Sequence, residues 1–170
     1  MNKLGSKIGI EFNNFKKEYN KDIKLIFEPG KYLVSEAGFF LTKVNYVKEG
    51  AKNKFAQINS GFNHFIRPAL YNSFHEIENI SNPRAKKEKY SVVGYICEND
   101  TFAENRKISK INKGDILCFK NAGAYGFSMS SNYNSRYTPA EVCLYNNKFK
   151  LIRKSQEIND LISNQIIIDL

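Results

Sequence analysis

The sequence has no tryptophan, two histidines and three cysteines among its 170 residues. Cys97, Cys118 and Cys143 form no CxxC pair and adjoin no His-rich cluster, which argues against a zinc site or a disulfide framework. No run approaches the roughly 20 apolar residues of a membrane span. The first residues also lack the long apolar region of a secretory signal. We therefore expect a cytosolic protein with reduced thiols, no metal and no membrane contact.

Acidic residues are fewer than basic ones: 17 Asp and Glu stand against 26 Lys and Arg, giving a net charge of +9. A basic domain can bind nucleic acid or an anionic surface. The lysines are dispersed through turns such as "KEGAKNK" and "NPRAKKEK", so we expect no nucleic-acid partner. A basic nucleic-acid-binding barrel remains an alternative, and it predicts binding that depends steeply on salt.

The apolar residues, 42% of the chain, suffice for one full-sized domain. Phe12, Phe15 and Tyr19 recur at helical spacing, and the short β-rich run 23–27 ends at Pro29-Gly30. Mostly β-prone segments follow, and then a closing helix for which Ser155 is the expected cap. Their ranges are 32–50, 54–60, 90–98, 115–120, a hairpin over 140–154 turning at Asn146-Asn147, and the helix over 155–165.

This order predicts a mainly β fold, either a closed or nearly closed barrel or a sandwich, with a short C-terminal helix. The helix and strand before it have the form of the last unit of an α/β structure. We therefore divide the chain into residues 1–33, a remnant of an α/β barrel, and residues 34–170, a β domain.

Two polar stretches are candidate ligand sites. In "FEPGK", Glu28, Gly30 and Lys31 follow a predicted strand, and strand ends are where α/β folds bind ligands, although a solvent-exposed turn is the alternative. In "GFNHFIRPALY", Arg67 lies among apolar residues and must be paired or must await an anion, since an unpaired buried guanidinium is costly. Tyr71 is near enough in sequence to add a hydroxyl group.

Two further stretches complete the candidates. "YICEND" places Cys97 and Glu98 at a predicted strand end, where the thiol is either a proton donor or a small core residue. "NAGAYGFSMSSNYNSR", residues 121–136, has glycines around Tyr125 that allow a ligand to approach the backbone. It is either a binding loop or a surface loop whose Ser and Asn groups satisfy one another. Both histidines are interpreted as ordinary.

These stretches, in this order, resemble diaminopimelate decarboxylase. The segments that carry the resemblance are "EPGKYLVSEAG", "GFNHFIRPALY", "ICEND" and "GAYGFSMSSNYNSRYTPAEV", and it extends from about residue 7 to residue 163. That family uses pyridoxal phosphate in the last step of bacterial lysine synthesis. Its members have an eight-stranded α/β barrel followed by a β domain of the alanine-racemase/decarboxylase type. The resemblance covers the last barrel helix and strand and the β domain.

The resemblance implies a role for each candidate. Tyr125 would contact cofactor and substrate, and Arg67 and Tyr71 would hold a substrate carboxylate. Cys97 would return a proton to the α-carbon after CO₂ leaves, and Glu98 would bind the far ammonium group. In the family, the Cys-Glu pair completes the site of the other subunit, which implies a homodimer with shared active sites.

The cofactor-binding residues implied by the resemblance are Glu28, Gly30, Lys31 and Tyr125, of which Lys31 would also contact substrate. Lys31 stands where the family has Arg, a change that keeps the charge and loses the planar fork. "CENDTF" replaces the family's Cys-Glu-Ser-Gly-Asp, so we expect a different loop around the acid.

The family's Schiff-base lysine and phosphate site lie in the barrel, which this sequence does not contain. We therefore expect the chain to be inactive by itself, and a separate N-terminal barrel chain to be a possible partner. Two alternatives stay open. One is a related decarboxylase acting on lysine, ornithine or carboxynorspermidine; the other is a non-catalytic β domain kept for binding or assembly.

Overall fold

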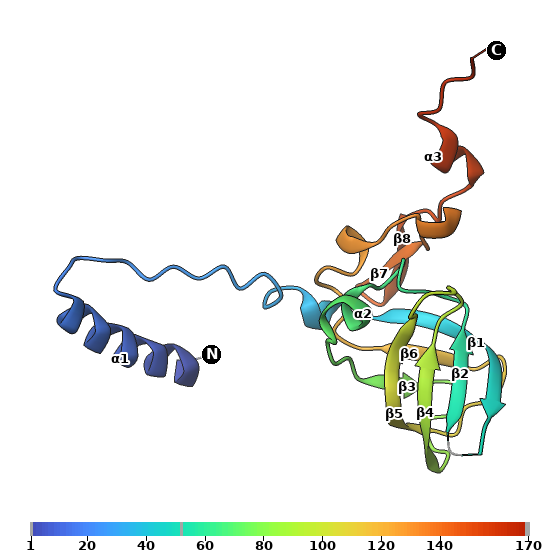
Figure 1. The fold of residues 1–170 in the computed structure, drawn as a ribbon, viewed down its shortest axis with the longest axis horizontal. Helices are drawn as coiled ribbons and strands as arrows, with labels where there is room; N and C mark the ends of the chain where they lie inside the picture. Colours follow the sequence, from blue (N-terminus) through green and yellow to red (C-terminus); the bar gives the residue numbers. More distant parts are fainter. Residues whose placement is uncertain (1, 52, 169–170) are drawn as a thin grey trace. The chain divides into compact units, whose positions relative to one another are not determined.

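The computed structural model describes residues 2–51 and 53–168. The chain forms two compact units, Met1–Gly30 and Lys31–Leu170. Figure 1 shows the first as a helix with a trailing segment and the second as a curved sheet with a hairpin and short helices. The assignment of the first unit to an α/β barrel remains a prediction.

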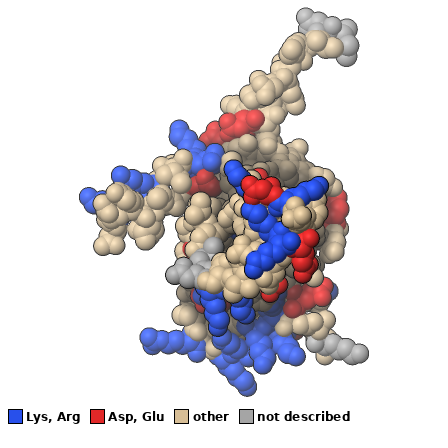
Figure 2. Space-filling model, turned by 90° about the vertical axis from the view of Figure 1, so that its left-hand side faces the viewer, with Lys and Arg blue, Asp and Glu red and all other residues tan. Residues whose placement is uncertain are grey.

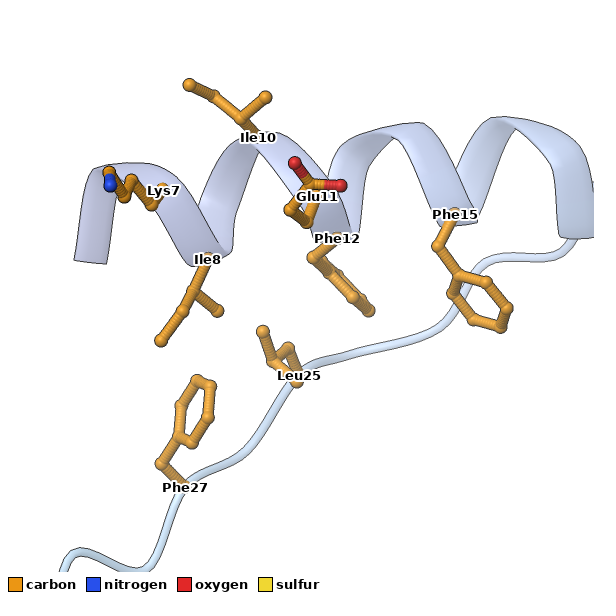
Figure 3. A pocket seen from close by; sticks show the side chains of 8 residues that line it. All are labelled: Lys7, Ile8, Ile10, Glu11, Phe12, Phe15, Leu25 and Phe27. Atoms are coloured by element: carbon orange, nitrogen blue, oxygen red, sulfur yellow. The ribbon is translucent and has the colours of Figure 1, made fainter. Parts of the chain in front are cut away.

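The first unit is built on helix α1, Asn2–Tyr19. The rings of Phe15 and Tyr19 stack with centroids 5.3 Å apart, so the predicted amphipathic helix is confirmed. In Figure 3, Ile8 and Phe12 point toward Leu25 and Phe27 of the trailing segment.

The predicted strand at 23–27 is wrong for this structure, which has an irregular segment there. A strand is held by backbone hydrogen bonds to a neighbouring strand. None of the strands in the described residues belongs to this first unit, so the segment has no neighbour with which to pair.

The second unit is a six-stranded sheet with the order β3-β6-β1-β2-β4-β5. Every neighbouring pair is antiparallel except β2 and β4, which are parallel. The edge strands β3 and β5 also contact each other, so the sheet is nearly closed and the predicted mainly β barrel is confirmed. Its strands are β1 Phe40–Glu49, β2 Lys54–Ile58, β3 Ile77–Asn79, β4 Lys87–Val93, β5 Thr101–Ser109 and β6 Ile116–Phe119.

Aromatic rings fill the interior of this barrel. Phe65 and Phe119 are almost completely buried, and Phe40 packs against both, with ring centroids 5.4 and 5.6 Å away. Phe102 lies 5.4 Å from Phe119. Burial of such rings is worth roughly 1.5–3 kcal/mol for each side chain, so this cluster is a main source of stability for the barrel.

Several predicted boundaries move. The run 32–50 becomes a strand only at Phe40, because a 3₁₀ helix, Ser35–Ala37, precedes it. The pairing of β1 with β2 is irregular between Val44 and Tyr46. Gly38 meets Gly123, whose Cα would be 2.3 Å from a Cβ built on Gly38. β4 ends at Val93, so Cys97 and Glu98 do not lie at the strand end where the sequence placed them.

Strands β3 and β5 were not predicted. β3 has only three residues, too few to show a period of two. β5 has the polar sequence "TFAENRKIS", with Asn105 in a left-handed conformation at φ 50°. Its pairing partner β4 decides its conformation, rather than its own apolar pattern.

The C-terminal elements follow the prediction with one change. β7, Glu141–Tyr145, and β8, Lys148–Arg153, form the expected hairpin, and Asn146 and Asn147 turn it with φ of 48° and 58°. Helix α3, Ile158–Ile162, follows. Its cap is Glu157, not Ser155, because Glu157 and Asp160 form a reciprocal capping box.

Lys and Arg side chains gather at the lower edge of the view in Figure 2, while Asp and Glu lie among basic residues above them. In β4 and β5, Lys89 stands directly opposite Lys107. Whether this charge binds a nucleic acid is untested, so the expected lack of such a partner stays a prediction. None of the helices in the described residues is long and apolar enough to cross a membrane.

Candidate functional site

Arg67 is the centre of a first cluster, which we call the Arg67 cluster: Arg67, Tyr71 and Tyr125. Arg67 begins the short helix α2, Arg67–Tyr71, with Pro68 in its first turn. Helical spacing of four places Tyr71 on the same face, and the guanidinium lies 5.1 Å from its ring centroid. The ring of Tyr125, far along the chain, lies 5.4 Å from the same guanidinium. Cation–π contacts of this kind hold an arginine without neutralising it.

The Arg67 side chain is half-buried, and it takes part in none of the salt bridges formed among the described residues. Its planar fork of N–H donors is therefore available to a ligand. A guanidinium in this state is suited to bidentate binding of carboxylate or phosphate. The sequence left an internal salt bridge open for Arg67, and the structure has none among these residues.

The backbone that leads to Tyr125 packs so closely against another segment that only small residues fit there. Ala122 N donates to Gly38 O at 2.8 Å, and Gly123 N donates to Ser35 O at 3.0 Å. The start of the 121–136 stretch is therefore tied to the segment before β1. A Cβ on Gly123 would lie 1.9 Å from Val34 O. Tyr125 itself has φ 59° and remains 41% exposed. The glycines thus bring the tyrosine to the surface beside Arg67.

His75 adjoins this cluster and is buried. Its Nδ1 lies 2.9 Å from the carbonyl oxygen of Lys120, which can only accept, so Nδ1 carries the proton. Its Nε2 is buried without a hydrogen-bond partner among the described residues. Burial lowers the pKa of His75, and the nearby charges of Arg67 and Lys31 lower it further. The neutral imidazole therefore faces a positively charged neighbourhood.

A second cluster, the Cys97 cluster, consists of Cys97, Glu98 and Tyr133. Cys97 and Glu98 lie in a loop between β4 and β5, which corrects their predicted place at a strand end. The Cys97 thiol donates to Glu98 Oε2 at 3.4 Å, and the hydroxyl of Tyr133 donates to Glu98 Oε1. The bond from Tyr133 is the main cause of a lowered pKa for Glu98, and the same bond is the main cause of a raised pKa for Tyr133.

Asp100 holds the loop that carries this cluster. Its carboxylate is buried and accepts from Ile96 N at 2.9 Å and from Phe62 N at 2.7 Å. Burial raises the pKa of Asp100 and the two backbone donors oppose the rise. Gly94 is required here, because a Cβ on it would lie 2.0 Å from an Asp100 oxygen.

The structure therefore gathers five predicted residues into two groups. Among the described residues, no recorded hydrogen bond, ion pair or ring contact joins the Arg67 cluster to the Cys97 cluster. Residues 121–136 contribute to both, with Tyr125 in the first and Tyr133 in the second. Tyr133 and His75 were not predicted as site residues, although Tyr133 lies within the quoted polar stretch.

The structure says less about the three remaining predicted residues, Lys31, Glu28 and Gly30. Lys31 is exposed and in no salt bridge of the described chain. Glu28 and Gly30 belong to the first unit, and their predicted place at the site stays a prediction. Across residues 2–51 and 53–168, no group of three or more His, Cys, Asp or Glu side chains could hold a metal ion.

Comparison with known proteins gives a family. Residues 31–123 match the family model "Pyridoxal-dependent decarboxylase, C-terminal sheet domain". The chain belongs to this decarboxylase family. The match covers more than half of the chain and includes Arg67, Tyr71, Cys97 and Glu98, but it ends before Tyr125.

Similar full-length decarboxylases are known. Diaminopimelate decarboxylase from Methanothermobacter thermautotrophicus is 42% identical over 168 residues, which are 97% of this chain and 39% of that protein. A crystal structure of diaminopimelate decarboxylase from M. jannaschii superposes with a TM-score of 0.77 at 39% identity, covering 85% of this chain and 33% of the other. The M. jannaschii enzyme in complex with L-lysine gives 0.78 at 36% identity, covering 94% and 37%. This chain thus spans about two fifths or less of these relatives.

Proposed function

We propose that this chain is the C-terminal part of a pyridoxal phosphate-dependent diaminopimelate decarboxylase, which converts meso-2,6-diaminopimelate into L-lysine and CO₂. The observation that carries the proposal is Arg67, stacked on Tyr71 and Tyr125 with no carboxylate partner among the described residues. Such a guanidinium is suited to bind the carboxylate of an amino acid. The substrate is proposed from the relatives, one of which is a diaminopimelate decarboxylase 42% identical to this chain.

In this proposal the two clusters contact one substrate molecule. Arg67 and the Tyr71 hydroxyl hold a carboxylate, and Glu98 accepts hydrogen bonds from the far ammonium group. Cys97 donates its thiol proton to the α-carbon once CO₂ has left. The thiol is exposed and lies 3.4 Å from Glu98 Oε2, so acid and anion are presented together. Positioning of this kind supplies much of the rate in such reactions.

The residues fit an anionic aromatic cofactor. Arg67 and Lys31 are cations outside the salt bridges of the described residues, and Tyr125 offers an exposed ring and hydroxyl. Tyr125, Lys31, Glu28 and Gly30 would hold pyridoxal phosphate, which when bound accepts the electron pair left by the departing carboxylate. Lys31 would act as a point charge, without the two parallel hydrogen bonds of an arginine.

The remaining parts of the proposal concern assembly. The Cys97 cluster would complete the site of a second subunit in a homodimer, and a barrel, on this or a separate chain, would supply the lysine that carries the cofactor. We also propose a cytosolic location, which cell fractionation tests.

A chimera tests the activity. The part of the M. thermautotrophicus enzyme that matches this chain is replaced by residues 2–168, and CO₂ release is measured with meso-diaminopimelate, lysine, ornithine and carboxynorspermidine. We expect release from diaminopimelate alone. Release from another amino acid instead would reassign the substrate, and an inactive but folded, cofactor-loaded chimera would favour a non-catalytic β domain.

The 170-residue chain by itself should release no CO₂ when mixed with pyridoxal phosphate and diaminopimelate, because the family's cofactor lysine lies in the barrel. Mass spectrometry after borohydride reduction provides the second readout. A stoichiometric adduct on one lysine, accompanied by CO₂ release, would contradict this expectation.

A further inference from the structure

Tyr133 contacts Glu98 from a well-anchored position. Its hydroxyl donates to Glu98 Oε1, and its ring packs on Phe62 with centroids 5.3 Å apart. Ser131 N, two residues earlier, donates to Asn63 O at 2.8 Å. The tyrosine is therefore fixed to the 61–63 loop by ring packing and by backbone.

The same loop supports Glu98 from the other side. Asp100 accepts from Phe62 N and from Ile96 N, so the loop that carries Cys97 and Glu98 is tied to the loop on which Tyr133 packs. Donor and acceptor thus stand on one common frame. Their hydrogen bond joins positions 35 residues apart in sequence.

The Tyr133 segment adopts a conformation that turns its ring toward this frame. Asn134 and Ser135 have φ of 55° and 54°, and Asn132 Nδ2 donates to Arg136 O at 2.8 Å. Asn132 Nδ2 also contacts Gln156 Oε1 at 2.5 Å, which ties the segment to the chain before α3. The Ser and Asn residues of the polar stretch therefore fix the position of Tyr133.

Glu98 is exposed and in no salt bridge of the described chain, so its side chain would otherwise sample many rotamers. A carboxylate has about four lone-pair sites. Tyr133 occupies one on Oε1 and Cys97 occupies one on Oε2. Acceptor capacity remains for a cationic ligand, in an orientation that the tyrosine sets.

We infer that Tyr133 is a positioning residue that orients Glu98 to receive the far ammonium group of the substrate. The inference rests on the proposed function, because the ammonium group belongs to diaminopimelate and to its product lysine. Their hydrogen bond lowers the pKa of Glu98 and raises the pKa of Tyr133. At neutral pH the carboxylate is an acceptor and the hydroxyl a donor.

The test replaces the hydroxyl and keeps the ring. Tyr133→Phe preserves the packing on Phe62 and removes the bond to Glu98. Tyr137→Phe, four residues along, is the matched control. Among the described residues the Tyr137 hydroxyl forms no hydrogen bond, and only its backbone oxygen is used, by His64. Both variants are made in the chimera with the M. thermautotrophicus barrel.

L-Lysine and 6-aminohexanoate, which differ only in the α-ammonium group, are compared as competitive inhibitors. The α-carbon of L-lysine keeps its carboxylate, so its ammonium group is the far ammonium group of diaminopimelate. We expect Tyr133→Phe to weaken inhibition by L-lysine and to raise KM for diaminopimelate, each about tenfold, with inhibition by 6-aminohexanoate and kcat nearly unchanged. A purely structural role would change both inhibitors alike or neither. Tyr137→Phe should change nothing.

A second readout uses the 170-residue chain alone. With ¹³C-labelled glutamate, NMR titration follows the Glu98 carboxyl, and Tyr133→Phe should move its pKa up toward the usual value. An active chimera in which lysine and 6-aminohexanoate respond equally, or an unchanged Glu98 titration, would overturn the role of Tyr133. A chimera inactive with unmodified Tyr133 would overturn the proposed function, and the ammonium role with it.

Discussion

At the scale of single residues, Arg67 carries a charge that no carboxylate of the described residues neutralises. Replacement by Lys keeps the charge and loses the fork and the flat stacking face. We expect Arg67→Lys in the chimera to lower kcat/KM for diaminopimelate by about 10–100-fold, as for the loss of one charge-assisted hydrogen bond or two. Arg84→Lys is the matched control, because Arg84 is exposed and forms no salt bridge or cation–π contact with the described residues. Equal effects of the two substitutions on kcat/KM would contradict a role for Arg67 in the site.

His75 gives a pH dependence of stability. Its pKa in the folded chain is lowered below about 6.5, first by burial and then by Arg67 and Lys31. The unfolded state therefore binds this proton more readily, so the stability associated with neutral His75 is present above pH 6.5 and is lost as the pH falls below it.

We expect His75→Phe to keep the edge contact with Phe65 and to flatten the fall in melting temperature between pH 7 and pH 5. The loss of the bond to the Lys120 carbonyl should cost about 1 kcal/mol at pH 7. Circular dichroism at several pH values measures both. Because the pKa of His64 is also lowered by burial, part of the slope should remain. An unchanged slope in His75→Phe would contradict the prediction.

At the scale of elements, the start of the 121–136 stretch is hydrogen-bonded to the segment before β1. A Cβ on Gly123 would lie 1.9 Å from Val34 O and 2.8 Å from Gly38 N, which are backbone atoms that cannot rotate away. We expect Gly123→Ala to destabilise the β unit by about 2 kcal/mol or more, measured by urea unfolding with tyrosine fluorescence. Gly5→Ala is the control, since no atom lies within 4 Å and alanine favours helix α1. Wild-type stability in Gly123→Ala would show that the two segments separate easily.

The elements also show where local patterns suffice. The Asn146-Asn147 turn was predicted because asparagine tolerates the left-handed conformation, and both residues adopt it. The cap of α3 was placed at Ser155 because serine is a good cap, but Glu157 takes that role through Asp160. Competing caps two residues apart differ by little in local energy, so sequence preference alone does not separate them.

At the scale of the whole chain, the β7–β8 hairpin exposes apolar side chains on both faces. Leu144 and Phe149 are paired across the strands and are 60% and 77% exposed, and every residue of β8 is exposed. A two-stranded hairpin is marginally stable by itself. Surface of this kind indicates a protein interface.

We expect the 170-residue chain to bind an apolar dye and to self-associate at high concentration. The double change Leu144→Lys with Phe149→Glu adds one cation and one anion, so the net charge remains +9. It should reduce dye fluorescence several-fold and shift the protein to smaller species in light scattering. Unchanged dye binding would place the exposed apolar surface elsewhere, for example on α1.

The sequence by itself determined the mainly β fold, the hairpin turn, the amphipathic helix and the residue types of the site, since each depends on backbone preferences or patterns within a few residues. Only the tertiary structure decided which of those residues meet. Tyr133 reaches Glu98 and Tyr125 reaches Arg67 because strand register and paired glycines bring distant loops together. Those contacts join positions too far apart in the chain for any local pattern to encode.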